Sequence, residues 1–112
     1  MRIWLAALLI GAVATSASAD PETYHSLKYD ISKRADCKHS ELRTTTAYRC
    51  EKDQSLWYFT KEKNPAHPAV IKRFFVSTPD GGVVREQVWS ADPQAPAFQK
   101  WRKTVEALEA GK

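Results

Sequence analysis

The sequence has few of the residues that mark several protein classes. Four glycines and six prolines among 112 residues exclude collagen-like and low-complexity chains. Two cysteines are too few for a mini-protein held together by many disulfides, or for a zinc site with four thiolates. Neither sign of charge is in large excess, because 17 basic and 13 acidic residues give a formal charge of +4. We therefore expect no nucleic-acid partner.

The one long apolar run lies at the N-terminus. Met1 and Arg2 precede apolar residues 3–14, and Ala17 and Ala19 occupy the −3 and −1 positions of an A-x-A cleavage site. A helix of that length spans about 18 Å, whereas the hydrocarbon core of a bilayer is roughly 30 Å thick. We predict that residues 1–19 are a cleaved secretory signal peptide. Residues 20–112 then form a single small domain without a membrane span, in the bacterial periplasm or outside the cell.

Cys37 and Cys50 are the only thiols of the chain, and both lie in the predicted exported part. In an oxidising compartment such a pair is expected to form one intramolecular disulfide bond. A redox pair or a haem attachment site would need a Cys-x-x-Cys spacing, which this sequence does not contain. We predict a structural disulfide. On the chain-entropy model, a closed loop of about 14 residues stabilises the fold by about 3 kcal/mol.

The rest of the chain predicts an α+β fold. Alternating β-branched and aromatic residues indicate four strands, over residues 44–50, 56–60, 70–76 and 83–89. The Pro79-Asp80-Gly81 step between the last two strands is typical of a hairpin turn. Apolar residues at spacings of three and four over residues 98–108 predict an amphipathic C-terminal helix. We expect a small, mainly antiparallel four-stranded sheet with this helix packed on one face.

Residues 20–36 fit two structures. Pro21 and Glu22 are typical of the first turn of a helix, but residues 27–31 alternate as a half-buried strand does. The start signal and the length of the segment favour the helix.

Aromatic residues give the best indication of function. Trp57 belongs to three consecutive aromatic residues in one predicted strand, and rings at adjacent positions point to opposite faces of a sheet. If the C-terminal helix covers one face, Trp57 or Phe75 can lie exposed on the other. His67, between two prolines, lies in the most distinctive loop. We predict a monomeric, non-enzymatic binding protein without a cofactor, with an envelope protein or a glycan as its partner and with Trp57, Phe75 and His67 as candidate binding residues.

Two alternatives stay open. His67, Arg73, Arg85 and Glu86 are residue types that a small secreted hydrolase, for example one like a ribonuclease, would use as acid, base and phosphate ligands. Adjacent strand residues such as Arg85 and Glu86 point to opposite faces, and no hydrolase motif is present, so we assign no catalytic residue. The second alternative is metal transport through His39 and His67. The histidines do not have the spacing of a metal site, so we assign no metal ligand.

Overall fold

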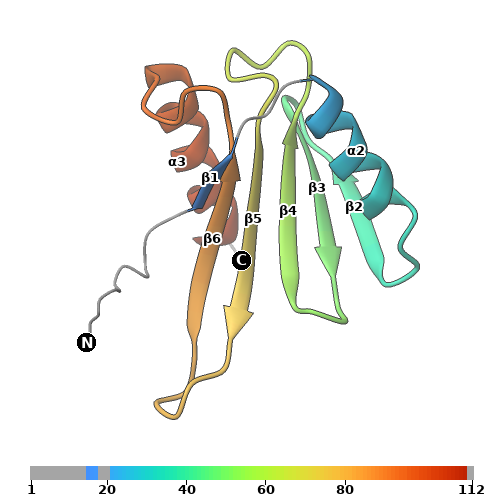
Figure 1. The fold of residues 1–112 in the computed structure, drawn as a ribbon, viewed down its shortest axis with the longest axis vertical. Coiled ribbons are helices and arrows are strands. Elements are labelled where there is room, and N and C mark those ends of the chain that lie inside the picture. Colours follow the sequence, from blue (N-terminus) through green and yellow to red (C-terminus); the bar gives the residue numbers. More distant parts are fainter. Residues whose placement is uncertain (1–14, 18–20, 111–112) are drawn as a thin grey trace.

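The computed structural model describes residues 15–17 and 21–110, and Figure 1 gives the arrangement of their helices and strands. In chain order the elements are β1 (Thr15–Ala17), α2 (Pro21–Ser32), β2 (Cys37–Glu41), β3 (Thr45–Cys50), β4 (Ser55–Thr60), β5 (Val70–Val76), β6 (Val83–Trp89) and α3 (Pro96–Ala110). The apolar run of the predicted signal peptide and its cleavage site lie outside the described residues.

The sheet is built from five antiparallel strands in the order β6-β5-β4-β3-β2, with the short β1 added in parallel beside β6. The α+β class is therefore confirmed, but the expected count of four strands is wrong. The missed antiparallel strand is β2, which lies at an edge and pairs with β3 alone. Four of its five residues are exposed, so its sequence carries no apolar alternation that could have revealed it.

Helix α3 covers one face of the sheet, as predicted (Figure 1). Phe98, Trp101 and Val105 recur at helical spacing, and all three are buried against Tyr58 and Ile71 of the sheet. The indole Nε1 of Trp101 also donates a hydrogen bond to a threonine hydroxyl of β3, at 2.9 Å. The apolar stripe of α3 is therefore used completely as core.

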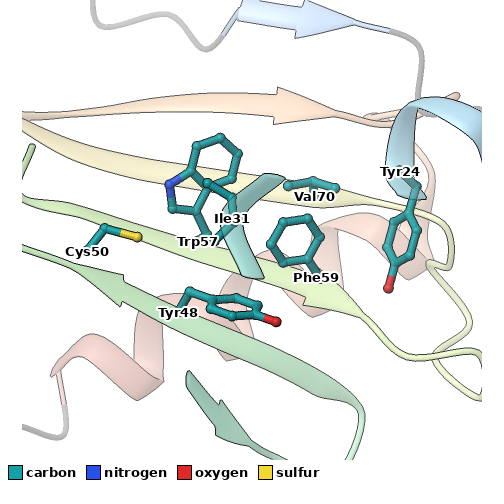
Figure 2. Close-up of a cluster of buried hydrophobic side chains, with 7 residues drawn as sticks. All are labelled: Tyr24, Ile31, Tyr48, Cys50, Trp57, Phe59 and Val70. Atoms are coloured by element: carbon teal, nitrogen blue, oxygen red, sulfur yellow. The ribbon is translucent and has the colours of Figure 1, made fainter. Parts of the chain in front are cut away.

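Helix α2 lies on the opposite face, so the helical interpretation of this segment is confirmed. It begins at Pro21 and buries Tyr24 and Ile31. Figure 2 shows the cluster that results, in which these two side chains meet residues of β3, β4 and β5: Tyr48, Cys50, Trp57, Phe59 and Val70. In Figure 1, α2 lies over the β2–β3 side of the sheet, and neither described helix lies over β5 and β6 on this face. Among the described residues, the helices therefore cover this second face only in part.

The predicted hairpin between β5 and β6 is also present. Gly81 and Gly82 have φ values of 121° and 148°, which side chains rarely adopt. A Cβ atom on Gly82 would lie 2.1 Å from Cζ of Phe75, so the Phe75 ring packs directly over this glycine. Within the described residues, no helix is long and apolar enough to cross a membrane.

Candidate functional site

The structure places the three predicted binding residues in three separate environments. Trp57 is buried, with 6% of its surface exposed, on the face that α2 partly covers. Phe75 is 42% exposed but points to the α3 face. Arg73 and Ile71 lie two and four residues before it on β5, and Ile71 is buried in the α3 core. Side chains an even number of residues apart on a strand share a face. His67 lies in the loop between β4 and β5. The three side chains do not form one site.

His67 is held by structural contacts. Its Nδ1 atom is 2.9 Å from the hydroxyl of Thr60, and its ring centroid is 4.9 Å from that of Tyr24 in an edge-on arrangement. The Tyr24 hydroxyl in turn donates a hydrogen bond to the Thr60 carbonyl. Burial, with smaller effects from Tyr48 and nearby carboxylates, raises the pKa of Tyr24 to about 12. The His67 loop thus joins α2 to the end of β4.

The uncovered half of the second face carries a cluster of aromatic and cationic side chains. We call it the tryptophan–lysine surface, and it consists of Trp57, Lys72, Phe74, Arg85 and Trp89. Trp57 on β4 is directly opposite Lys72 on β5, and Phe74 is opposite Arg85 on β6. Since residues opposite each other and residues two apart along a strand share a face, all five belong to the same side of the sheet.

The rings and the ammonium group of this surface are in direct contact. The Lys72 Nζ atom lies 5.1 Å from the Trp57 ring centroid and 4.9 Å from that of Phe74, within cation–π range of both. Trp57 and Trp89 are stacked, with centroids 5.7 Å apart and planes 19° from parallel. Lys72, Phe74 and Trp89 are half-buried and Arg85 is exposed, so an approaching ligand can reach the outer sides of these groups.

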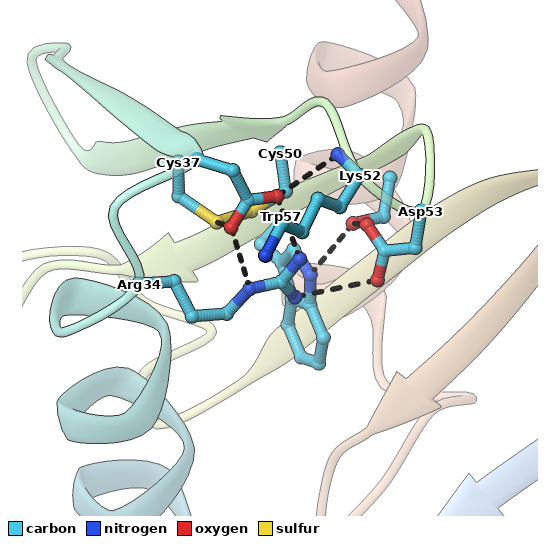
Figure 3. Close-up of a disulfide and its surroundings, with 8 residues drawn as sticks. Arg34, Cys37, Cys50, Lys52, Asp53 and Trp57 are labelled. Carbon is cyan, nitrogen blue, oxygen red and sulfur yellow. Dashed lines mark hydrogen bonds and ion pairs between the residues drawn. A yellow bond between two sulfur atoms is a disulfide. The ribbon is translucent and has the colours of Figure 1, made fainter.

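Hydrogen bonds fix the indole ring of Trp57 (Figure 3). Its Nε1 donates to the Ser55 hydroxyl at 3.1 Å, and that hydroxyl donates to Asp53 at 2.6 Å. Arg34, just beyond α2, binds Asp36 at 2.8 Å and Asp53 at 3.3 Å. The turn before β4 is thereby tied to the end of α2, beside the disulfide.

The two carboxylates of this network are kept ionised. Hydrogen bonds from Arg34 and from the Lys52 backbone lower the pKa of Asp36. Burial alone would raise the pKa of Asp53, but hydrogen bonds from Ser55 and Arg34, with the charges of Arg34 and Lys72, lower it. Within residues 21–110, neither Lys72 nor Arg85 has a carboxylate within ion-pair distance. Lys72 therefore acts on Asp53 only through its charge at longer range, and the Arg85 side chain is exposed.

A second charged cluster lies between α3 and the sheet. Arg73 and Arg102 both pair with Glu86, at 3.1 and 2.5 Å, and Arg73 also pairs with Glu109 of α3 at 3.0 Å. The Tyr58 hydroxyl donates to Glu109 at 2.9 Å. Burial and the Glu109 charge raise the pKa of Tyr58, so its hydroxyl stays protonated. Because each carboxylate is already paired with arginine, the cluster fixes α3 on the sheet.

The residues of the hydrolase hypothesis are not assembled into one site. Arg73 and Glu86 belong to the ion-pair cluster below α3, whereas Arg85 points to the opposite face and His67 is bonded to Thr60. The histidines of the metal hypothesis are likewise not grouped with other possible ligands. The Nε2 atom of His39, on β2, lies 3.7 Å from the Oε2 atom of Glu41. In residues 15–17 and 21–110, no three histidine, cysteine or acidic side chains are grouped so that they could hold a metal ion.

A shallow hollow of about 590 Å³ lies beside α2, lined by His25, Ser26, Lys28, Tyr29, Ser32 and Tyr48. Tyr29 is 61% exposed at its rim. The hollow has one lysine and no arrangement of stacked rings, so it serves below as a control surface.

Sequence reasoning chose Trp57 as a candidate binding residue but did not choose the partly exposed residues around it: Lys72, Phe74, Arg85 and Trp89. The signal was present, because alternation along residues 70–76 and 83–89 places Lys72 and Phe74 on one side and Arg85 and Trp89 beside them. What the sequence did not reveal is that α2 lies over the β2–β3 side of the sheet and not over β5. No protein-family model, curated protein or solved structure matches the chain, so the assignment of the site rests on its geometry.

Proposed function

We propose that the protein is an exported, non-enzymatic binding protein and that the tryptophan–lysine surface binds an acidic glycan of the cell envelope. The observation that carries this proposal concerns two cations, Lys72 and Arg85, that have no carboxylate within ion-pair distance in residues 21–110. They lie among half-buried rings on the part of the sheet that α2 does not cover. The Cys37–Cys50 disulfide is compatible with an oxidising compartment such as the periplasm or the exterior of the cell.

The chemistry of the surface supports a ligand with an apolar face and a negative charge. The faces of Trp89 and Phe74 offer flat apolar contact, which suits the C–H face of a sugar ring. Lys72 and Arg85 donate charge-assisted hydrogen bonds, which suit a carboxylate or sulfate carried by that sugar. The ammonium of Lys72 is held in place by two rings, so little side-chain freedom is lost when it binds.

The experiment is a binding titration with an acidic polysaccharide, polygalacturonate, and a neutral one, dextran, at low and high salt. We expect binding to polygalacturonate alone, weakened by salt because screening acts on exposed charges. Arg85→Glu should reduce the affinity about tenfold or more, since it replaces an attraction by a repulsion. The matched control is Lys28→Glu, the same change of charge on the hollow beside α2, and it should leave the affinity within about twofold.

Equal loss of affinity in the Arg85→Glu and Lys28→Glu variants would contradict the proposal, because binding would then depend on net charge alone. Absence of binding to polygalacturonate at low salt would also contradict it. A protein from envelope extracts that binds the wild type and not Arg85→Glu would keep the surface as the site and replace the glycan by an acidic protein.

A further inference from the structure

The two edges of the sheet differ in how they are protected. The β2 edge is short, and its exposed residues include Lys38, His39 and Glu41, polar side chains of the kind that discourages the addition of another strand. The β6 edge has seven residues, contains no proline, and begins with Val83 and Val84, which are 41% and 60% exposed. The middle of β6, residues 85–87, is charged or polar, so the apolar part of this edge is its start at Val83 and Val84, where strand addition is opposed least.

The chain itself already pairs with part of this edge. Residues Thr15–Ala17 lie parallel to β6, with Thr15 opposite Gln87, Ser16 opposite Val88 and Ala17 opposite Trp89 (Figure 1). Only the last three residues of β6 are paired in this way, and residues 83–86 have no partner on this side within the described chain. The described part of the chain thus shows that this edge accepts a parallel strand.

We propose that the β6 edge is an acceptor site for an extended polypeptide segment that adds as a parallel strand. In the full chain the site is occupied by the chain's own residues 15–17. If the leader is cleaved after Ala19, as the sequence predicts, that strand leaves with it and the edge opens. The site therefore becomes available only when processing is complete.

The register specifies the kind of segment that fits. The chain's own strand has small uncharged residues, threonine, serine and alanine, opposite residues 87–89. A longer parallel strand would continue at its N-terminal end along residues 83–86. Apolar side chains of that strand would lie beside Val84 and near Phe75, which is opposite Val84 on β5. The expected ligand is an extended segment with apolar residues followed by small ones, bound through its main chain.

The first test uses the full chain and measures hydrogen exchange at those backbone amides of residues 87–89 whose N–H groups point towards β1 and not towards β5. The variant carries Thr15→Pro and Ser16→Pro together, because N–H groups of adjacent strand residues point to opposite sides and one of the two must face β6. The control carries alanine at both positions and keeps the N–H groups. We expect exchange to rise about tenfold or more in the proline variant alone, with the melting temperature changed little in both variants.

The second test adds a synthetic peptide with the sequence of residues 13–19 to the proline variant. The peptide should restore the slow exchange at residues 87–89, and the same peptide N-methylated at alternate residues should not. Val84→Lys in the proline variant should weaken peptide binding about tenfold, since lysine on an edge opposes strand addition. Ser40→Lys on β2, the matched change at the other edge, should have no effect.

Two results would overturn the proposal. One is unchanged exchange in the proline variant, which would mean that β1 does not occupy the edge. The other is concentration-dependent dimerisation of the proline variant that the peptide does not reverse, which would make a second copy the partner of β6. The glycan proposal is tested independently, because Arg85→Glu changes the sheet face, whereas Val84→Lys changes the edge.

Discussion

The disulfide is the contact whose removal has the most calculable consequence. Cys37 and Cys50 are directly opposite each other on β2 and β3, and their bond closes a loop with a sequence separation of 13. The entropy of closing a loop of this length in the unfolded chain corresponds to about 3 kcal/mol. A domain of this size is typically stable by roughly 5–14 kcal/mol, so the bond supplies a large part of the total.

The structure also predicts where the fold loosens first when the bond is lost. Cys37 is the only residue of β2 that is not exposed, and Cys50 is buried beside Trp57 in the α2-side core. Without the bond, β2 keeps its backbone pairing with β3 and, at its far end, the contacts of Glu41 with Thr46 and Lys61, but the end at Cys37 loses its covalent link. We therefore expect fraying of β2 at a temperature at which β3 and β4 are still folded.

The assay compares the oxidised wild type with the Cys37→Ala/Cys50→Ala variant by thermal unfolding and hydrogen exchange. For a domain of 60–100 residues, 1 kcal/mol corresponds to about 4–8 °C, so a fall of about 12–24 °C in melting temperature is expected. The reduced wild type, which has the same packing residues as the oxidised form, serves as the control for lost volume at Cys50. Intact mass should confirm two fewer hydrogens in the oxidised chain.

A loss below about 1 kcal/mol in both the variant and the reduced wild type would refute the argument from loop closure. Equal exchange rates in β2 with and without the bond would refute the argument that the bond holds this edge. The two results are separate, because global stability and local fraying are measured at different amides.

Three further predictions follow from other contacts. Glu86→Gln, which removes the charge shared by two arginines, should cost about 1.5–3 kcal/mol in urea unfolding; no change would mean that the pairs are too hydrated to matter. Because the folded-state pKa of Tyr24 is raised to about 12, its contribution is complete below the unfolded pKa of about 10 and is lost as the pH rises towards 12. Tyr24→Phe should flatten the alkaline fall in stability, and an unchanged profile would assign that fall to other groups. Gly82→Ala, whose Cβ would collide with Phe75, should cost about 1–3 kcal/mol by thermal unfolding, and more than Gly81→Ala, which meets no atom within 4 Å; equal costs would mean that only backbone strain matters.

Local signals in the sequence were sufficient for most of the fold. Alternation of apolar residues located β3 to β6 to within about a residue, and proline, aspartate and glycine together located the β5–β6 turn. The helix spacing of Phe98, Trp101 and Val105 located α3 and its buried face. Each of these elements buries a periodic apolar set, and that set is visible without knowledge of its partners.

The elements that were missed have no periodic apolar set. Strand β2 is held by its pairing with β3 and by Cys37, and the remainder of its side chains face solvent. Strand β1 lies within the segment that the sequence assigns to the leader, and its pairing depends on the position of β6 far along the chain. Both depend on long-range backbone pairing, which propensity and periodicity do not encode.

The extent of α2 explains why the site was only partly predicted. From the sequence, Trp57 or Phe75 was expected on the face that the C-terminal helix leaves uncovered, but Phe75 lies on the α3 face and Trp57 is buried beside α2. In the structure, α2 ends at Ser32, and Arg34 then turns the chain by binding Asp36 and Asp53. This ion-pair network fixes the C-terminal end of α2 on the β2 side of the sheet and links residues far apart in sequence.

The contrast between the two faces supports a function for the open one. Each square ångström of apolar surface buried is worth about 25 cal/mol, and a domain of this size has little stability to spare. On the α3 face the rings of the helix itself, Phe98 and Trp101, are 2% and 4% exposed, and the ring that stays exposed is Phe75, which packs on Gly82 of the β5–β6 turn. On the open face Phe74 and Trp89 keep part of their surfaces in water beside two cations without acidic partners in the described chain. Folding alone gains nothing from that exposure, whereas a ligand that covers both rings and neutralises both cations would recover the unused hydrophobic and electrostatic free energy together.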